Sequence, residues 1–136
     1  MEFKAWVIGL AAVANASIAQ QSNGGLPAPV MLFFDWGKRE IRGDDGAMLD
    51  QVAASFRGRP NARLAIAGHT DRSGAASVNR ATGLLRADLV RVELEKRGVP
   101  RNAMSVTSFG EDQPLIATED GVREVQNRRV VIAFEE

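Results

Sequence analysis

The pattern of apolar and polar positions predicts a series of strands and helices from residue 30 onward. Short, continuous apolar runs bounded by turn residues are typical of buried strands, whereas apolar residues three and four positions apart are typical of a helix with one buried face. By these criteria we expect strands at residues 30–34, 62–68, 104–109 and 129–134. We expect helices at residues 44–57, where Asp44 and Asp45 offer a cap, and at 78–96, with a short third helix near 122–125.

The order of these elements predicts an α+β fold, an α/β sandwich of the form βαβαββ in which two main helices pack on one mixed four-stranded sheet. If the first helix is a crossover connection, the first two strands run parallel and their carboxyl ends lie at the same edge of the sheet. Asp35 follows the first strand and Asp71 follows the second, and ligands bind such sheets outside the carboxyl ends of the strands. The alternative is that both acids only form turns or cap a helix, as aspartate commonly does.

The first 29 residues differ in composition from the rest of the chain. Lys4 precedes an apolar stretch and then small residues, which is the pattern of a secretory signal peptide over residues 1–19. The apolar run covers about ten residues, and a membrane-spanning helix needs about 20, so an uncleaved anchor is the weaker alternative. Residues 20–29 have the composition of a flexible linker, and residues 30–136 are expected to form the folded domain. After cleavage of the signal peptide we expect no transmembrane segment.

The composition excludes several classes of function. The 17 basic and 17 acidic side chains give a formal net charge of zero, so nucleic acid and anionic membrane surfaces are not expected partners. The chain has no cysteine, which excludes thiolate metal sites, catalysis by a thiol and a lipid anchor attached through cysteine. It has a single histidine, His69, so a hydrolytic triad is not expected. An enzyme needs a positioned nucleophile or a metal-bound water. We therefore expect no catalytic residue, no metal site and no cofactor, and we interpret His69 as a hydrogen-bonded turn residue.

Arg86 lies in the middle of the apolar side of the second helix, on an arc that includes Val78 and Leu85. An unpaired buried guanidinium would cost several kcal/mol of desolvation, so we expect an anionic group to meet it. Because helical side chains lean toward the amino end of their helix, Arg86 points back toward the loop that carries Asp71. Two interpretations remain open. One is a structural ion pair of Arg86 with Asp71 or Glu93, and the other is a pocket in which Asp71 binds the ammonium and Arg86 the carboxylate of an amino acid head group.

Short segments along the chain resemble, in order and approximate spacing, the OmpA-like peptidoglycan-binding domain found in outer membrane protein A, peptidoglycan-associated lipoproteins and flagellar stator proteins. These segments read FFDWGKREI, GHTDRSG, VNRATGLLRADLV, SFGEDQP and NRRVVI, and the resemblance spans residues 30–134. It implies the OmpA-like fold and the binding of diaminopimelate, in the peptide stems of Gram-negative cell wall, through Asp71 and Arg86. The further residues that it implies as walls, braces or backbone contacts of the pocket are Asn79, Phe34, Asp35, Thr70 and Ser73.

The resemblance implies a cell wall anchor that is periplasmic and associated with the outer membrane, with peptidoglycan and outer membrane proteins as partners. The alternative is an envelope structural or assembly protein that acts through a protein partner and has a weakened peptidoglycan site. Thr82 and Gly83 motivate this alternative, because the family usually has leucine and serine there and the replacement leaves a shallower wall beside the predicted site. For Arg128 and Arg129 we expect packing and surface ion pairs. We interpret Trp36 as an exposed turn residue, with stacking on glycan as the weaker alternative.

Overall fold

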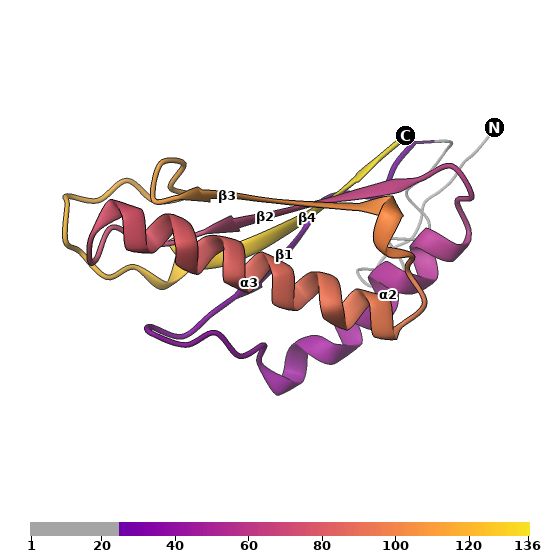
Figure 1. Ribbon diagram of the computed structural model, residues 1–136, viewed down its shortest axis with the longest axis horizontal. Helices are drawn as coiled ribbons and strands as arrows, with labels where there is room; N and C mark the ends of the chain where they lie inside the picture. Colours follow the sequence, from indigo (N-terminus) through magenta and orange to yellow (C-terminus); the bar gives the residue numbers. More distant parts are fainter. Residues whose placement is uncertain (1–24) are drawn as a thin grey trace, which may run out of the picture.

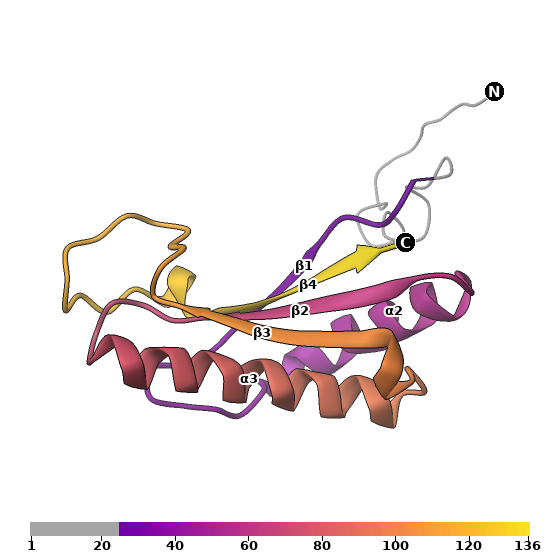
Figure 2. The same ribbon diagram turned by 45° about the horizontal axis from the view of Figure 1, so that its top comes forward.

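Two helices cover one face of a four-stranded mixed sheet (Figures 1 and 2). The computed structural model describes residues 25–136, so the expected signal peptide and residues 20–24 of the expected linker lie outside the described residues. The strands are β1 (Val30–Phe33), β2 (Arg63–His69), β3 (Met104–Gly110) and β4 (Arg129–Glu135). The helices are α2 (Gly46–Arg57) and α3 (Ala76–Lys96), and 3-10 turns occur at Gly43–Asp45, Arg101–Ala103 and Val125–Asn127. The predicted fold class is confirmed.

The last strand lies in the interior of the sheet, between the first two strands. The strand order is β1-β4-β2-β3, and β4 pairs antiparallel with both β1 and β2. β1 and β2 therefore run parallel to one another, as predicted, although they are not hydrogen-bonded neighbours. Because β4 runs in the opposite direction, its first residues lie at the same edge as the carboxyl ends of β1 and β2.

The core lies between the sheet and the two helices. Fully buried side chains come from β1, β2, β4 and both helices, and they include Leu32, Ile66 and Ile132 from the strands and Val52 and Val90 from the helices. Burial of apolar area, at about 25 cal/mol per Å², is the main stabilising contribution in such a core. Among residues 25–136, no helix has the length and apolar character that crossing a membrane requires.

The face of α3 that meets the sheet differs from the predicted one. Val78 and Leu85, expected on the buried arc, are 60% and 37% exposed. The buried line instead consists of Asn79, Gly83, Arg86, Ala87, Val90, Arg91 and Leu94. The prediction was wrong about Val78 and Leu85 because it treated every apolar residue near Arg86 as facing the core. The sheet contacts a narrower line of the helix.

A pair of glycines sets the distance between α3 and β2. A Cβ atom built on Gly68 would lie 1.8 Å from the carbonyl oxygen of Gly83, and one built on Gly83 would lie 2.4 Å from the Oγ of Ser108. Neither position has room for a side chain, so the backbones of α3 and β2 pack directly on one another. The expectation that Gly83 leaves a shallower wall beside Arg86 was therefore wrong, because Gly83 faces the sheet.

Two local expectations also differ from the structure. Asp45 occupies the N-cap position of α2, but its side chain makes no capping hydrogen bond. The short helix expected near 122–125 is only the 3-10 turn at Val125–Asn127. The backbone N–H of Gly121 donates to the carbonyl of Arg72, and the N–H of Glu124 donates to the carboxylate of Asp71. These two N–H groups attach residues 121–124 to the loop after β2, so they are not available for the backbone hydrogen bonds of a longer helix.

Candidate functional site

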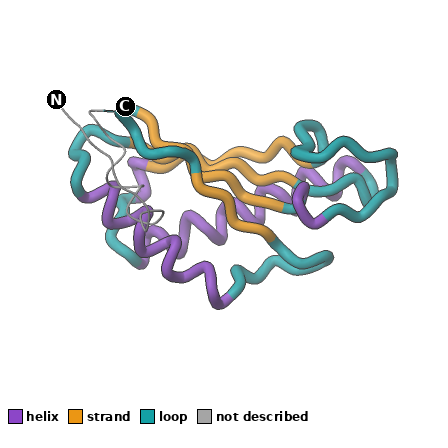
Figure 3. Tube along the Cα trace, turned by 180° about the vertical axis from the view of Figure 1, so that it is seen from behind, coloured by secondary structure: helices purple, strands orange, loops and turns teal. Residues whose placement is uncertain are grey.

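A cavity of about 410 Å³ opens at the edge of the sheet where β1 and β2 end and β4 begins. Figure 3 shows the loops that follow β1 and β2 and the loop that precedes β4 at the same end of the sheet. We call this space the Asp71 cavity. The residues that line it are Trp36, Gly37, Thr70, Asp71, Ser73, Gly74, Val78, Asn79, Thr82, Arg86, Gly121, Arg123 and Arg128.

The carboxylate of Asp71 is buried and accepts four hydrogen bonds. Its Oδ1 accepts from the backbone N–H of Ser73 at 3.2 Å and from the Oγ of Ser73 at 2.6 Å. Its Oδ2 accepts from the Nη1 of Arg128 at 2.7 Å and from the backbone N–H of Glu124 at 3.1 Å. Burial by itself would raise the pKa of Asp71, but the hydrogen bonds from Ser73, Arg128 and Glu124 outweigh it and lower the pKa below its usual value. Asp71 is therefore a fixed negative charge at neutral pH.

Arg128 is the cation that neutralises Asp71, and the sequence interpretation missed it. Besides the ion pair with Asp71, its Nε donates to the carbonyl of Phe34 at 3.0 Å. The side chain is buried, whereas we expected packing or a surface ion pair. Neighbouring strand residues face opposite sides. Accordingly, Arg129 points away from the cavity and donates to the carbonyl of Gln113 at 3.1 Å. The place of β4 between β1 and β2 brings Arg128 to the site, and no local pattern in the sequence shows that placement.

Arg86 is buried without an acidic partner among the described residues. Its Nε and Nη2 donate to the carbonyl of Lys38 at 3.0 and 2.8 Å, and its guanidinium carbon lies 5.2 Å from the centre of the Phe34 ring. The first of the two interpretations of Arg86, a structural ion pair with Asp71 or Glu93, does not hold within the described part of the chain. Asp71 binds Arg128 instead, and Glu93 binds Lys96 and Arg97.

The surroundings of Arg86 disfavour its charged form and lower its pKa. Burial is the largest cause and, together with repulsion from Arg128 and Arg39, lowers the pKa to about 10, while attraction from Asp71 opposes the change. The guanidinium stays protonated at neutral pH. Its hydrogen bonds to the described residues come from Nε and Nη2, and none comes from Nη1. Arg86 is therefore a cation that faces the cavity with a free donor, which is the condition for binding an anion.

Asn79, Thr70 and Ser73 hold the loop that carries Asp71. The Nδ2 of Asn79 donates to the carbonyls of Asp71 and Ser73 at 3.3 and 3.0 Å and to the carboxylate of Glu111 at 2.8 Å. The Oγ1 of Thr70 donates to the carbonyl of Asp71, and its backbone N–H donates to the carbonyl of Gly110. The three residues line the cavity and also brace it.

Asp35 and Phe34 are not among the residues that line the Asp71 cavity. The carboxylate of Asp35 is exposed and accepts a hydrogen bond from Arg42 at 2.9 Å. Phe34 is fully buried and lies under the guanidinium of Arg86. The structure therefore places Phe34 as the floor beneath a cavity residue and Asp35 on the outer side of the same loop.

Trp36 and Arg123 meet at the cavity and join the loop after β1 to the segment before β4. The guanidinium carbon of Arg123 lies 3.4 Å from the centre of the Trp36 ring, and the indole N–H donates to the Oγ of Ser73 at 3.2 Å. Trp36 is 48% exposed, in agreement with an exposed turn residue. Arg123 was not singled out in the sequence, since a lone arginine in a polar connection carries no pattern of its own.

His69 lies at the end of β2 and is buried, which differs from the hydrogen-bonded turn residue that we expected. Its ring stacks on that of Phe109, with centroids 5.3 Å apart, and its Nδ1 has no hydrogen-bond partner within residues 25–136. Burial, with a smaller contribution from Arg129, lowers its pKa to about 4. His69 is therefore neutral at physiological pH and packs as an aromatic side chain.

Comparison with known proteins relates this domain to a family of envelope proteins. The model of the OmpA family matches residues 33–128. A peptidoglycan-associated lipoprotein from Rhizobium meliloti is 39% identical over 100 residues, which cover 74% of this chain and 57% of that protein. One from Pasteurella multocida is 33% identical over 103 residues, which cover 76% of this chain and 69% of that protein. The chain thus spans little more than half the length of the Rhizobium relative.

Solved structures give the same result. The crystal structure of the peptidoglycan-associated lipoprotein from Burkholderia pseudomallei superimposes with a TM-score of 0.72 at 30% identity, covering 77% of this chain and 89% of that one. The periplasmic domain of Helicobacter pylori MotB, at 21% identity, shares the fold with a TM-score of 0.66, covering 78% of this chain and 74% of that one. The family model matches the residues that line the cavity, both helices and the strands β2 and β3, and this match shows that the chain belongs to the OmpA family.

Proposed function

We propose that this protein binds peptidoglycan noncovalently, through the diaminopimelate residue of the peptide stem, and serves as a cell wall anchor in the periplasm, associated with the outer membrane. The observation that carries the proposal is Arg86, a buried and protonated guanidinium that faces the Asp71 cavity with no acidic partner among the described residues. The relatives named peptidoglycan-associated lipoprotein support it.

The charges around the cavity favour a ligand that brings a carboxylate. The lining contains the arginines Arg86, Arg123 and Arg128 and one acid, Asp71. Arg128 is neutralised by Asp71, and Arg123 lies on the ring of Trp36. A carboxylate in the cavity would accept from the free Nη1 of Arg86 and remove the cost of its unpaired charge.

The ammonium group of the ligand binds Asp71 at Oδ1, because Oδ2 is paired with Arg128. The carboxylate of Asp71 already accepts four hydrogen bonds. One of the four donors is the hydroxyl of Ser73, which can rotate away from Oδ1 and can accept a hydrogen bond as well as donate one. The ammonium can therefore replace the Ser73 hydroxyl at Oδ1, which leaves the pair with Arg128 intact. The end of diaminopimelate that remains free in a peptide stem carries an ammonium and a carboxylate on one carbon, which matches this pairing of acid and base.

The binding is noncovalent, and we propose no catalytic step. Asp71 and Arg86 recognise charge and hydrogen-bond geometry, and neither has a partner arranged to activate a nucleophile. The function is therefore retention on the wall, with the cavity as the contact point.

Sedimentation with insoluble peptidoglycan tests the proposal. The purified protein is incubated with peptidoglycan that contains diaminopimelate, and the bound fraction is compared with that of Asp71→Ala and Arg86→Ala. Arg80→Ala is the matched control, because Arg80 lies on the same helix and its ion pair with Asp112 is exposed. We expect at least a tenfold loss of affinity for the two cavity variants and no change for the control. Equal binding by all four proteins would show that the wall is held elsewhere.

A second substrate tests the part of the proposal that concerns diaminopimelate. In peptidoglycan that has lysine at the third stem position, the carboxylate proposed to meet Arg86 is missing. We expect the wild-type protein to bind this material at least tenfold more weakly, and Arg86→Ala to bind both materials equally weakly. Equal wild-type binding to both would retain wall binding and reject the role of the carboxylate.

A further inference from the structure

Arg123 is an exposed cation in the lining of the Asp71 cavity, and none of the ligand contacts proposed above involves it. It takes part in none of the ion pairs that residues 25–136 form with one another. Arg128, in the same lining, is paired with Asp71. The guanidinium of Arg123 contacts the ring of Trp36 instead of a carboxylate. The charge of Arg123 is therefore open to a ligand.

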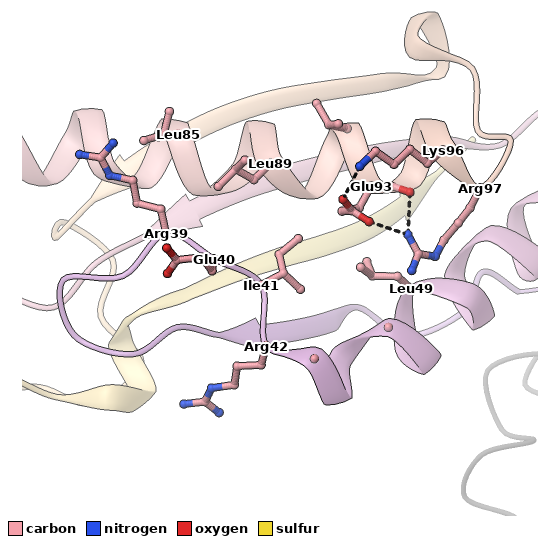
Figure 4. Close-up of a pocket in the computed structure, with 13 residues that line it drawn as sticks. Arg39, Glu40, Ile41, Arg42, Leu49, Leu85, Leu89, Glu93, Lys96 and Arg97 are labelled. Atoms are coloured by element: carbon pink, nitrogen blue, oxygen red, sulfur yellow. Dashed lines mark hydrogen bonds and ion pairs between the residues drawn. The ribbon is translucent and has the colours of Figure 1, made fainter.

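Two cations that line a larger hollow between α2 and α3 show the opposite arrangement (Figure 4). Lys96 and Arg97 both bind the carboxylate of Glu93 at 3.0 Å. Arg97 also binds Asp50 at 2.7 Å. A ligand that met these two cations would have to compete with carboxylates of the protein. At Arg123 a ligand meets no such competition.

The acids on either side of Arg123 in the sequence are held by other groups. The carboxylate of Asp120 lies 3.9 Å from the guanidinium of Arg72. The carboxylate of Glu124 accepts a hydrogen bond from the backbone N–H of Gln126 at 3.1 Å. The segment that carries Arg123 therefore does not neutralise it.

The backbone on both sides of Arg123 is fixed to the loop after β2. The N–H of Gly121 donates to the carbonyl of Arg72 at 2.9 Å, and the N–H of Glu124 donates to the carboxylate of Asp71 at 3.1 Å. These two bonds hold the main chain two residues before and one residue after Arg123. A ligand that binds Arg123 thus pays little entropy for ordering this segment.

The ring of Trp36 holds the guanidinium of Arg123 by its flat face. The guanidinium carbon lies 3.4 Å from the ring centre, and the indole N–H donates to the Oγ of Ser73 at 3.2 Å, which fixes the ring. A guanidinium stacked in this way keeps the N–H groups at its edge free to bind a carboxylate through two hydrogen bonds. Because Ser73 also donates to Asp71, the stacked pair is joined directly to the proposed diaminopimelate site.

We propose that Arg123, stacked on Trp36, is a second carboxylate subsite of the Asp71 cavity. It binds a carboxylate of the stem peptide other than the one proposed to meet Arg86, so this inference rests on the proposed function. A stem peptide carries two such groups, the α-carboxylate of the glutamate that precedes diaminopimelate and the carboxylate that ends the stem. Both offer the same chemistry to a guanidinium, and the experiment distinguishes them.

The experiment uses a synthetic stem tetrapeptide, alanine–γ-glutamate–meso-diaminopimelate–alanine, in three forms. One form is unmodified, one has the glutamate α-carboxylate as an amide, and one has the terminal carboxylate as an amide. Affinities for the wild-type protein and for Arg123→Ala are measured by isothermal titration calorimetry. We expect one of the amides to bind the wild type about fivefold more weakly than the unmodified peptide, which identifies the carboxylate, and we expect Arg123→Ala to bind these two peptides equally.

The outcomes separate this inference from the proposed function. Equal wild-type binding of all three peptides would overturn the second subsite and leave diaminopimelate binding intact. Binding of none of them would overturn the proposed function and this inference with it. If Arg123→Ala weakened all three peptides by the same factor and kept the preference, Arg123 would be only a structural residue of the cavity, and the inference would be wrong.

Variants of Trp36 test the stacking platform. Trp36→Phe keeps a ring under the guanidinium but loses the indole N–H, whereas Trp36→Leu loses the ring. We expect Trp36→Phe to keep the preference for the carboxylate and Trp36→Leu to reduce it to about twofold. Arg80→Ala is the control, because Arg80 is exposed, pairs with Asp112 and lies outside the lining, and it should keep the full preference. A full preference in Trp36→Leu would contradict the role of the ring.

Discussion

Arg86 and Arg128 are two buried guanidiniums at one cavity, and their surroundings differ. Arg128 has a carboxylate and a carbonyl as partners, whereas Arg86 has only the carbonyl of Lys38 and the ring of Phe34. Because Asp71 is already neutralised by Arg128, the charge of Arg86 remains available to a ligand. The division of roles between the two arginines is the basis of the proposed site.

Arg128 should therefore be a residue on which both folding and binding depend. Replacing it by alanine leaves Asp71 buried without its cation, and breaking a buried ion pair in this way costs about 3 kcal/mol. Arg128→Lys keeps the charge but loses the geometry that joins Asp71 to the carbonyl of Phe34. We expect Arg128→Ala to lower the free energy of unfolding by about 3 kcal/mol in urea denaturation, and Arg128→Lys by less. An unchanged unfolding free energy in Arg128→Ala would contradict this.

His69 should make stability depend on pH in a defined window. The pKa is about 4 in the folded protein and near 6.5 in the unfolded chain, so only the unfolded chain binds a proton between these values. Above pH 6.5, His69 should contribute no pH dependence to the free energy of unfolding. As the pH is lowered from 6.5 to 4, protonation of His69 in the unfolded chain should lower this free energy. In His69→Asn the decline over this window should be smaller, as measured by urea denaturation at intervals of half a pH unit. The pKa of Asp71 is lowered in the folded protein, so the contribution of Asp71 to the free energy of unfolding is lost only below about pH 3.8. The effects of His69 and Asp71 therefore fall in different pH ranges.

Among the elements, helix α3 shows two faces with different surroundings. The inner line contains Arg86 at the cavity and the glycine contact with β2, and the outer line contains Val78 and Leu85, which are exposed. The length and position of the helix were predicted from its apolar spacing. The choice of face was predicted correctly for Arg86 and wrongly for Val78 and Leu85. Periodicity shows that a helix has an apolar side, but the sheet selects which part of that side it covers.

The glycine contact should be intolerant of even one methyl group. In Gly68→Ala the new Cβ would meet the backbone carbonyl of Gly83, which can move only if the helix moves. We expect this variant to lose about 3 kcal/mol or more, at the upper end of the overpacking range. In Gly83→Ala the new atom meets the side chain of Ser108, and the better helix propensity of alanine offsets about 1 kcal/mol, so a smaller loss is expected.

Gly43→Ala is the control for these two variants, because a Cβ built at Gly43 meets nothing within 4 Å. Its unfolding free energy should stay within about 0.5 kcal/mol of the wild type. Thermal and urea denaturation of the three variants provide the comparison. A loss in Gly43→Ala as large as that in Gly68→Ala would show that glycine itself, and not the close approach, is what matters.

At the scale of the whole molecule, the cavity is assembled by topology. Its residues come from the loops after β1 and β2, from the start of α3 and from the segment before β4. Glu124 and Arg128 reach Asp71 across sequence separations of 53 and 57 residues. The site can therefore exist only when the sheet is complete, and ligand binding and folding should be thermodynamically linked.

Free meso-diaminopimelate should accordingly stabilise the folded protein. At a ligand concentration of 100 times Kd, the expected gain in unfolding free energy is about 2.7 kcal/mol, provided the ligand does not bind the unfolded chain. Differential scanning calorimetry should show a rise in Tm that grows with ligand concentration in the wild type and is absent in Arg86→Ala. Free lysine, which lacks the second carboxylate, is the control ligand. An equal rise with lysine would show that the second carboxylate is not recognised.

The spacing of apolar and polar residues was enough to predict the strands, the two helices, the parallel direction of the first two strands and the burial of Arg86 near Asp71. These features follow from spacing along the chain and from general rules of connection, which act locally. Three features emerged only from the folded arrangement: Arg128 neutralises Asp71, Gly83 packs on Gly68, and Val78 and Leu85 face outward. Each of these depends on β4 entering the sheet between β1 and β2, or on how closely α3 approaches β2. Such contacts join residues far apart in sequence, and their geometry is set by packing.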